Sequence, residues 1–255
     1  MLSSDSTCYS WHMAASPASS SRVDAVVTEL RKGVFEGRYP PGTPLRELTL
    51  ARDLSVSQAT IREALQRLQY TGLITRQANV GSAVTRLSVK EVRERVELRA
   101  ILEVMAALEA SGRMRDGEFD ELESRLSALE AAVASDRYYE AAQADLQFHR
   151  YVWQCSGNQT LSRHLELLTV PLFAFMSILR SQGLERLLNV VEAHRPLVSA
   201  LRSRDPVRIR AEFQKGATSA YGMFLGGGPE HAVLAAFGLL EPGSSLHRPD
   251  LPPTA

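Results

Sequence analysis

Two short segments with apolar residues at helical spacing lie on either side of Ser57. The residues that share these two faces are Leu50, Ala51 and Leu54 in the first segment and Ile61, Leu65 and Leu68 in the second. Val56 can fill the corner between the segments. Ser57 is suited to cap the second helix, because its side-chain oxygen can accept a hydrogen bond from a free backbone N–H. The pattern predicts a helix-turn-helix within residues 47–66.

A preceding helix and a following β-hairpin complete a small domain. The helix is predicted at about residues 21–37 and ends before a stretch rich in proline and glycine. Two β-prone runs, at 72–76 and 81–86, are joined by a short turn. Asn79 and Gly81 suit the tip of that turn, since glycine accepts a positive φ and lets the backbone approach a phosphate. Three helices and a hairpin predict a winged helix.

Beyond the hairpin, the pattern is helical almost to the C-terminus. Ser88 is the expected N-cap of a long helix that stops near Gly112. The residues of this helix expected to face inward are Val92, Val96, Ile101, Leu102 and Met105. Further helices are predicted near 116–135, 137–155, 159–180, 184–204 and 206–225. The predicted fold class is mainly α, with an N-terminal winged helix-turn-helix followed by an antiparallel all-α bundle of about six helices.

The charges are unevenly distributed, although 29 basic and 29 acidic side chains balance over the 255 residues. Residues 21–87 hold ten basic and six acidic side chains, a net charge of +4, whereas residues 88–225 hold 18 basic and 19 acidic ones. A basic excess is what neutralisation of DNA phosphates requires. Cys8 and Cys155 suggest no disulfide framework, which fits a reducing cytoplasm. Neither a signal peptide nor an apolar run near 20 residues is evident, so no membrane partner is expected.

The start of the second helix of the helix-turn-helix is the predicted DNA-reading surface. A helix of this kind lies in the major groove and offers its N-terminal residues to base edges. The predicted DNA-binding residues are Arg46, Ser57, Gln58, Thr60, Arg62, Asn79 and Gly81. The segment taken alone is also compatible with an ordinary helical hairpin, and the predicted wing favours the DNA-binding interpretation.

Several motifs in register resemble the GntR family of bacterial transcription regulators. They are PPGTPL at 40–45, LARDLSVS at 50–57, IREALQRL at 61–68, GLI at 72–74 and Gly81. The resemblance implies a homodimer that binds a pseudo-palindromic double-stranded DNA operator. The family usually has arginine where this chain has Gln58. Gln favours an adenine edge and Arg favours guanine, so the departure predicts a different half-site.

Two ionisable residues lie four apart in the phrase ADLQFHR, namely Asp145 and His149. On a helix this spacing places both side chains on one face, where they can bind one ion. His194, in EAHRPLVSAL, offers a third ligand from a later helix. The residues alone leave open a second interpretation, in which the three are hydrogen-bonded core groups.

The phrases DLQFHRYVWQCSGNQTL and EAHRPLVSALRSRDP resemble the helical effector-binding (FCD) domain of the FadR-like subfamily. The resemblance implies a divalent metal held by one Asp and three His, together with a small carboxylate effector. The last His of the family falls at Gly216 in this chain. Two outcomes stay open: a metal of the zinc, nickel or manganese class at a three-ligand site of Asp145, His149 and His194, or a metal-free pocket for a different ligand.

Two further residues are predicted to bind the effector. Arg99, in VELRAILE, resembles the family arginine that faces the effector, and its guanidinium can bind a carboxylate with two hydrogen bonds. On helix spacing alone, Arg99 is equally suited to a salt bridge with Glu103. Asn158 follows Ser156-Gly157 and is expected to be a helix cap first and a pocket residue second.

Together these observations predict a cytoplasmic, dimeric, ligand-responsive transcription regulator, of the repressor type most frequent in the family, and not an enzyme. Two alternatives from other classes remain: a metallohydrolase that uses Asp145, His149 and His194 with Glu192 as base, and a ligand-free structural adaptor. The predicted regions are a flexible leader at 1–20, a winged helix domain at 21–87, an effector-binding and dimerisation domain at 88–228 and a partly disordered tail at 229–255.

Overall fold

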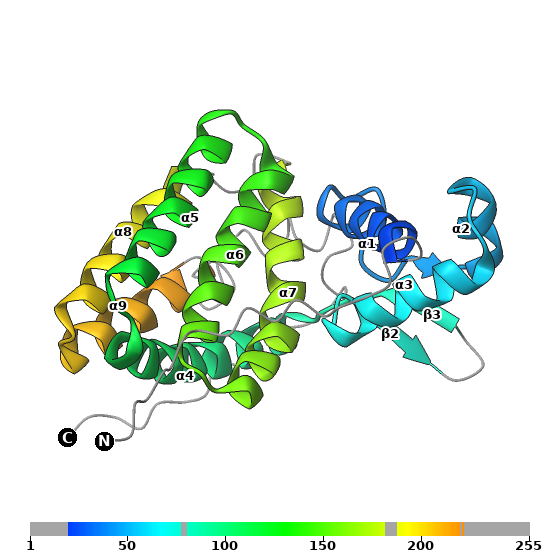
Figure 1. Ribbon diagram of the computed structural model, residues 1–255. Helices are drawn as coiled ribbons and strands as arrows, with labels where there is room; N and C mark the ends of the chain where they lie inside the picture. The colour runs from blue at the N-terminus through cyan, green and yellow to red at the C-terminus, as the bar shows by residue number, and fades with distance from the viewer. Residues whose placement is uncertain (1–19, 78–80, 182–187, 220, 222–255) are drawn as a thin grey trace, which may run out of the picture.

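A computed structural model describes residues 20–77, 81–181, 188–219 and 221. The predicted tail at 229–255 lies outside these residues, as does all of the predicted leader except Ser20. Asn79 at the predicted wing tip also lies outside them. The described residues form a small α/β head and a larger helical bundle, which lie side by side (Figure 1).

The head has the predicted winged helix architecture. Its helices are α1 (Ser20–Phe35), α2 (Glu47–Asp53) and α3 (Gln58–Tyr70), and its strands are β1 (Pro44–Leu45), β2 (Ile74–Gln77) and β3 (Gly81–Val84). The strands form an antiparallel sheet in the order β1-β3-β2. The hairpin of β2 and β3 was predicted, but the two-residue strand β1 was not, because Pro44 and Leu45 are too few to show an alternating pattern.

The turn between α2 and α3 is built as its sequence predicts. The Thr60 backbone N–H donates to Ser57 Oγ over 3.1 Å, which confirms Ser57 as the N-cap of α3. Leu54 and Val56 are half-buried and pack against the core of the head. These contacts fix the first turn of α3 at the surface, where it is available to a partner.

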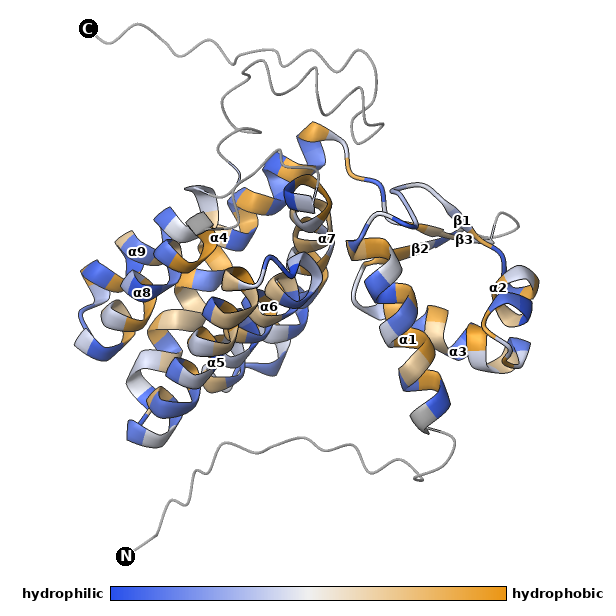
Figure 2. Ribbon diagram, turned by 90° about the horizontal axis from the view of Figure 1, so that it is seen from above, coloured by the Kyte–Doolittle hydropathy of each residue, from blue (hydrophilic) through white to orange (hydrophobic). Residues whose placement is uncertain are grey.

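Six described helices form the bundle, as predicted. They are α4 (Val89–Arg113), α5 (Asp116–Ala134), α6 (Tyr138–Cys155), α7 (Gln159–Ser181), α8 (Leu188–Ser203) and α9 (Pro206–Ser219). Ser88 caps α4 in a reciprocal arrangement: its Oγ accepts from the Glu91 backbone N–H, and the Glu91 carboxylate accepts from the Ser88 N–H. Figure 2 shows hydrophilic residues along the outer sides of α8 and α9.

The inward face of α4 differs from the predicted one. Ile101 and Met105 are 61% and 46% exposed, so their assignment to the core was wrong. The buried positions of α4 include Val92, Val96, Arg99, Glu103, Ala106 and Ala110. They follow alternating steps of four and three, which is the period of one helix face. Arg99 and Glu103 occupy the middle of this face. The pattern of apolar residues therefore indicated neighbouring positions instead.

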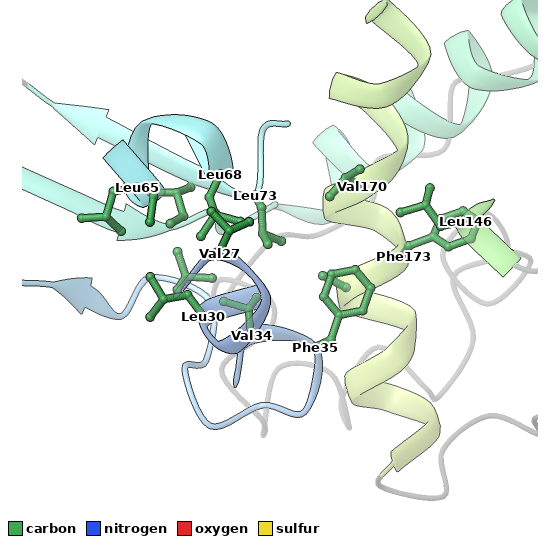
Figure 3. Packing of buried hydrophobic residues seen from close by; sticks show 14 of the residues in the cluster. Val27, Leu30, Val34, Phe35, Leu65, Leu68, Leu73, Leu146, Val170 and Phe173 are labelled. Atoms are coloured by element: carbon green, nitrogen blue, oxygen red, sulfur yellow. The ribbon is translucent and has the colours of Figure 1, made fainter. Parts of the chain in front are cut away.

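One apolar core joins the head to the bundle. It contains Val34 and Phe35 of α1 together with residues of α6 and α7. The Phe35 ring meets the Tyr139 ring edge-on, with centroids 6.0 Å apart. In Figure 3, Phe35 points toward α7, while Phe173 extends from the other side of α7 toward Leu146. Helix α7 therefore contacts the head on one face and the bundle interior on the other.

A break in the hydrogen bonding of α7 lies beside the end of α3. Pro171 has no N–H, so the Leu167 carbonyl lacks its usual partner in the helix. Arg95 of α4 donates to this carbonyl from Nη1 over 3.0 Å. Gly72, which follows α3 with φ +73°, is packed so closely that an added Cβ would lie 3.0 Å from the same oxygen. One carbonyl thus brings together α4, α7 and the chain that leaves α3.

Among the described helices, α7 alone is long and apolar enough to pass a membrane-span criterion, with a mean hydropathy of 1.2 over its most apolar window. Of that window, 67% is buried inside the protein. The apolar character of α7 is accounted for by its central position, since it packs against α1, α4 and α6. The sequence prediction that no run approaches a membrane span overlooked this helix.

Gly72→Ala should lower the free energy of unfolding by about 1–3 kcal/mol, because alanine disfavours positive φ and its methyl group would press on the Leu167 carbonyl. Gly112→Ala is the control. No atom lies within 4 Å of a Cβ added to Gly112, so alanine there should be neutral or stabilise α4 by up to about 1 kcal/mol. Urea denaturation measures both changes. Equal stability of the two variants would show that Gly72 is not held against α7.

Candidate functional site

The first turn of α3 presents polar side chains at the surface of the head. Gln58 and Arg62 are exposed, and Thr60 is half-buried. The Thr60 hydroxyl lies 2.8 Å from Ser57 Oγ, so these two side chains are held by each other at the cap. Gln58 has the freedom to reach a base edge, whereas Ser57 and Thr60 are already engaged in ordering the helix start.

Arg62 is oriented by an acidic residue of α2. Its Nε and Nη2 donate to Glu47 Oε2 over 3.2 and 3.0 Å. Arg76 of β2 lies 3.9 Å from the other oxygen of Glu47. The Arg62 side chain remains 57% exposed, so it is held in place but open to a phosphate or base. Glu47 therefore holds the basic side chains of α3 and the wing toward one side of the head.

Two other predicted DNA-binding residues are exposed in the head. Arg46 immediately precedes α2, and Gly81 begins β3 with φ +101° and no atom within 4 Å of an added Cβ. A positive φ explains why glycine suits this position. These placements are compatible with DNA contact, and the role of each residue stays a prediction.

A cavity of about 280 Å³ lies inside the bundle and is lined by five of its helices. Asp145 and His149 face it from α6, and His194 faces it from α8. Arg99 of α4 and Arg180 of α7 contribute positive charge, while Gly216 of α9 leaves part of the wall without a side chain. The structure thus brings together residues that lie more than 100 positions apart in the sequence.

The three predicted metal ligands converge at one point of the cavity. A ligand atom from each of Asp145, His149 and His194 lies within 4.8 Å of the other two. The His194 Nε2 is 3.0 Å from Asp145 Oδ1, and the His149 Nε2 is 3.5 Å from it. Asp145 Oδ1 and His194 Nε2 are nevertheless buried without an aligned hydrogen-bond partner. One oxygen and two nitrogens in this arrangement suit a divalent cation.

The outer nitrogen of each histidine faces an acceptor. Nδ1 of His194 lies 2.6 Å from the Val190 carbonyl, which can only accept, so that nitrogen carries the proton. Nδ1 of His149 lies 3.0 Å from Glu103 Oε1, which favours a proton there too. With the proton on Nδ1, a neutral ring, which is the form that binds a metal, would direct its Nε2 lone pair toward Asp145. Such contacts behind the ligands are the usual means by which proteins orient metal-binding histidines.

Arg99 is buried and already paired. Its Nη2 donates to Glu103 Oε1 over 3.3 Å, and its Nη1 donates to the Tyr221 hydroxyl over 3.4 Å. The guanidinium also lies 5.0 Å from the centroid of the Phe173 ring. The predicted effector residue and the predicted salt bridge with Glu103 therefore coexist, since Arg99 lines the cavity while Glu103 neutralises its charge from behind.

Charge pairing overcomes desolvation in this cluster. Burial raises the pKa of Glu103, but Arg99 and His149 outweigh it and lower that pKa to about 2. Burial likewise opposes ionisation of Asp145, yet His194, His149 and Arg180 lower its pKa to about 2. Burial lowers the pKa of His194, and the Asp145 carboxylate reverses the effect, so that the pKa is raised. The two carboxylates are thus held ionised inside the protein.

Sequence reasoning missed three contributors to this region. Arg180 and Tyr221 line the cavity, and Glu103 supports it from behind as the acceptor for Arg99 and for the Trp153 Nε1–H. Glu103 had a signal, because it continues the buried stripe of α4 one turn after Arg99. Arg180 had none in the sequence, since it ends an apolar helix where a solvated cation is ordinary.

Asn158 does not line this cavity. Its side-chain oxygen accepts from the Leu161 backbone N–H over 3.0 Å, which makes it the cap of α7. It also borders a separate, more apolar groove beside α4 and α7. The expectation of a cap is therefore met, and the geometry gives no support to Asn158 as a residue of the Asp145 site.

A winged helix head joined through a common core to a helical bundle with an internal cavity defines a class of DNA-binding regulators. Residues 22–84 match the family described as bacterial regulatory proteins, gntR family, and residues 94–215 match the FCD domain. The chain belongs to the GntR family of transcription regulators and carries an FCD domain; it is not an enzyme.

Curated relatives support this assignment. A probable D-xylose utilization operon transcriptional repressor of Paenarthrobacter nicotinovorans is 33% identical over 174 residues, which cover 68% of this chain and 75% of that protein. The repressor RspR of Escherichia coli is 29% identical and covers 69% of this chain and 77% of its own length. A gluconate operon transcriptional repressor of Bacillus licheniformis is 35% identical over 50% of this chain and 52% of that protein.

Solved structures share the fold. Escherichia coli McbR/YncC superposes with a TM-score of 0.68 at 20% identity and covers 80% of this chain and 97% of its own. A GntR regulator from Rhodococcus sp. RHA1 superposes with a TM-score of 0.62 at 18% identity and covers 81% and 98%. Both confirm the arrangement of a winged helix head and a helical bundle.

Arg62→Ala should weaken specific operator binding by about 1–3 kcal/mol, as expected for the loss of one base or phosphate contact. Thermal stability should change little, because an ion pair with one partner 57% exposed contributes at most about 1 kcal/mol. Arg202→Ala, on α8, removes an equal charge far from the head and is the control. Fluorescence anisotropy at matched salt measures both variants. Equal affinity of the two would remove Arg62 from the DNA-binding surface.

Proposed function

We propose that this regulator is a cytoplasmic homodimeric repressor that binds a pseudo-palindromic DNA operator and is controlled by a small carboxylate-bearing metabolite in the bundle. The observation that carries the proposal is the buried cavity in which Asp145, His149 and His194 converge beside two arginines. A dimer would present two α3 helices to two half-sites. Three curated relatives are named as transcriptional repressors, two of them of operons, which supports the repressor assignment.

The donor set fits a divalent metal. Asp145, His149 and His194 would hold it, and Glu103 and the Val190 carbonyl would keep both histidines oriented. A bound ion would supply positive charge and open coordination positions for oxygen atoms of the metabolite. Gly216 stands where the family resemblance implies a fourth ligand, and the space beside it is part of the cavity. The metabolite would therefore meet a more open site than in relatives with four protein ligands.

Coupling to DNA would pass through α7. Phe173 lines the cavity and also belongs to the core shared with Val34 and Phe35 of α1. A ligand that shifts Phe173 would move the helix that packs against the head, and the Leu167 carbonyl lies beside Gly72 at the end of α3. The segment 86–95, suggested by its position between wing and bundle, contributes through Arg95. The contacts through Phe173 and through Arg95 would therefore both influence the position of α3.

The ligand-free adaptor is the weaker alternative. An adaptor has no need of a cavity, whereas here two arginines, two histidines and a carboxylate face one. Burying such groups is costly unless they are paired or bind a ligand. The metallohydrolase alternative falls with the family assignment.

The proposed function predicts that binding of the metabolite lowers the affinity of the protein for the operator. Operator affinity of the metal-loaded protein should fall by about 5–150-fold when the metabolite saturates the cavity, which is a typical coupling. Native mass spectrometry with elemental analysis would report dimer, metal and retained metabolite, and anisotropy would report operator affinity. His149→Ala should bind the operator normally and lose the response. A metabolite that binds without changing operator affinity contradicts the proposal.

Gly216→His should restore a fourth ligand and strengthen metal binding. A tenfold gain adds about 1.4 kcal/mol of metal-dependent stability, which is roughly 3–6 °C in melting temperature for a chain of this size. Gly216→Ala is the control, because it recovers helix propensity without adding a donor. An added Cβ would lie 3.4 Å from Leu197, so either side chain needs only a small shift there. If neither variant gains stability from metal and His149→Ala still binds metabolite, the site is metal-free and built around Arg99.

A further inference from the structure

Arg180 is a buried cation, and among the residues that the structure describes no carboxylate lies within hydrogen-bond distance of it. The residue is 7% exposed, and its Nε has no hydrogen-bond partner. In the described part of the chain, the ion-pair partner of Arg180 is Asp145, whose Oδ2 lies 4.0 Å from Nη1, which is beyond hydrogen-bond distance. The side chain nevertheless lines the cavity. Burying a weakly paired guanidinium costs desolvation free energy. An anion bound beside Arg180 would offset that cost.

Arg99, the other cation of the cavity, is in a different state. The Glu103 carboxylate lies 3.3 Å from its Nη2 and neutralises the guanidinium. If a divalent ion binds Asp145, the carboxylate offsets half of the charge of the ion. One positive charge then remains at the metal and another at Arg180. The cavity therefore carries two separate positive centres, and only one of them belongs to the metal site.

We propose that Arg180 selects a dianionic effector: one carboxylate binds at the metal and Arg99, and a second anionic group, carboxylate or phosphate, binds the Arg180 guanidinium. The inference rests on the proposed function and adds to it the chemical class of the metabolite. The Nη groups of the planar guanidinium can donate to such a group. Arg180 is thus a specificity residue, while Asp145, His149 and His194 provide the common binding point.

The test compares acids that differ only in the second anionic group. Malate and 2-hydroxybutyrate share a 2-hydroxy acid head, and 3-phosphoglycerate and glycerate form a second pair that distinguishes phosphate from carboxylate. Isothermal titration with the metal-loaded full-length protein measures each affinity. Wild type should bind at least one dianion about 10- to 100-fold more tightly than its matched monoanion, since hydrogen bonds to a charged group are worth that factor.

Arg180→Met should abolish this preference, because it should weaken binding of the acid with two anionic groups far more than binding of its matched monoanion. Arg163→Met makes the same substitution at an exposed position of α7 and should retain the preference. Without metal or acid, Arg180→Met should change the melting temperature little, because the charge that it removes is only weakly paired, with Asp145 Oδ2 at 4.0 Å. A clear loss of stability would assign Arg180 a structural role and contradict the proposal.

Three other results would overturn the inference: equal affinity of wild type for both members of each pair, a preference that survives in Arg180→Met, or no binding of malate or 3-phosphoglycerate at millimolar concentration. Failure of the proposed function gives a different pattern. In that case His149→Ala would leave the affinities for all four acids as in wild type, because the acids would not bind at the metal site. Equal binding in wild type that His149→Ala abolishes would reject only the role of Arg180.

Discussion

The contacts of the buried Glu103 carboxylate hold together the polar interior of the bundle. Its Oε1 lies 3.0 to 3.3 Å from groups of His149, Arg99 and Trp153, which come from two helices. An ionised carboxylate at this depth is stable only because these partners surround it. In return, it neutralises Arg99 and favours the His149 tautomer that leaves Nε2 facing the cavity. The same group thus stabilises the packing of α4 on α6 and prepares the site chemically.

Helix α7 imposes the second constraint, since it packs against the head and the bundle at the same time. Its apolar residues are required on several sides, which explains a composition that would suit a membrane. Pro171 removes one hydrogen bond in the middle of the helix, and Arg95 supplies a replacement from α4. A donor on a long side chain allows more movement than a backbone N–H in a regular helix. This is the place where a change in the cavity could alter the contact with Gly72 at small energetic cost.

Local patterns in the sequence were sufficient for most of the fold. Ser57 and Ser88 were recognisable as caps because a cap needs only residues within one turn. The step of four from Asp145 to His149 revealed a common helix face for the same reason. Arg180 was not recognisable as a site residue, since its role depends on helices that meet only in the folded chain. Glu103 was recognisable as a salt-bridge partner of Arg99 one helical turn away, but its contacts with His149 and Trp153 of α6 were not. Ile101 and Met105 were misplaced because charged residues occupy the true inward stripe of α4.

The charge balance of the cavity links these points to the departure at Gly216. A histidine there would contribute a neutral donor and fill space, without changing the net charge of the site. Its absence therefore leaves the net charge of the cavity unchanged while leaving more room inside it. Different residues then set the two properties of the cavity: Gly216 affects its volume, and Arg180 affects its charge. Each can change without disturbing Glu103, so a regulator of this type can acquire a new effector while its folded core and its DNA-binding head stay the same.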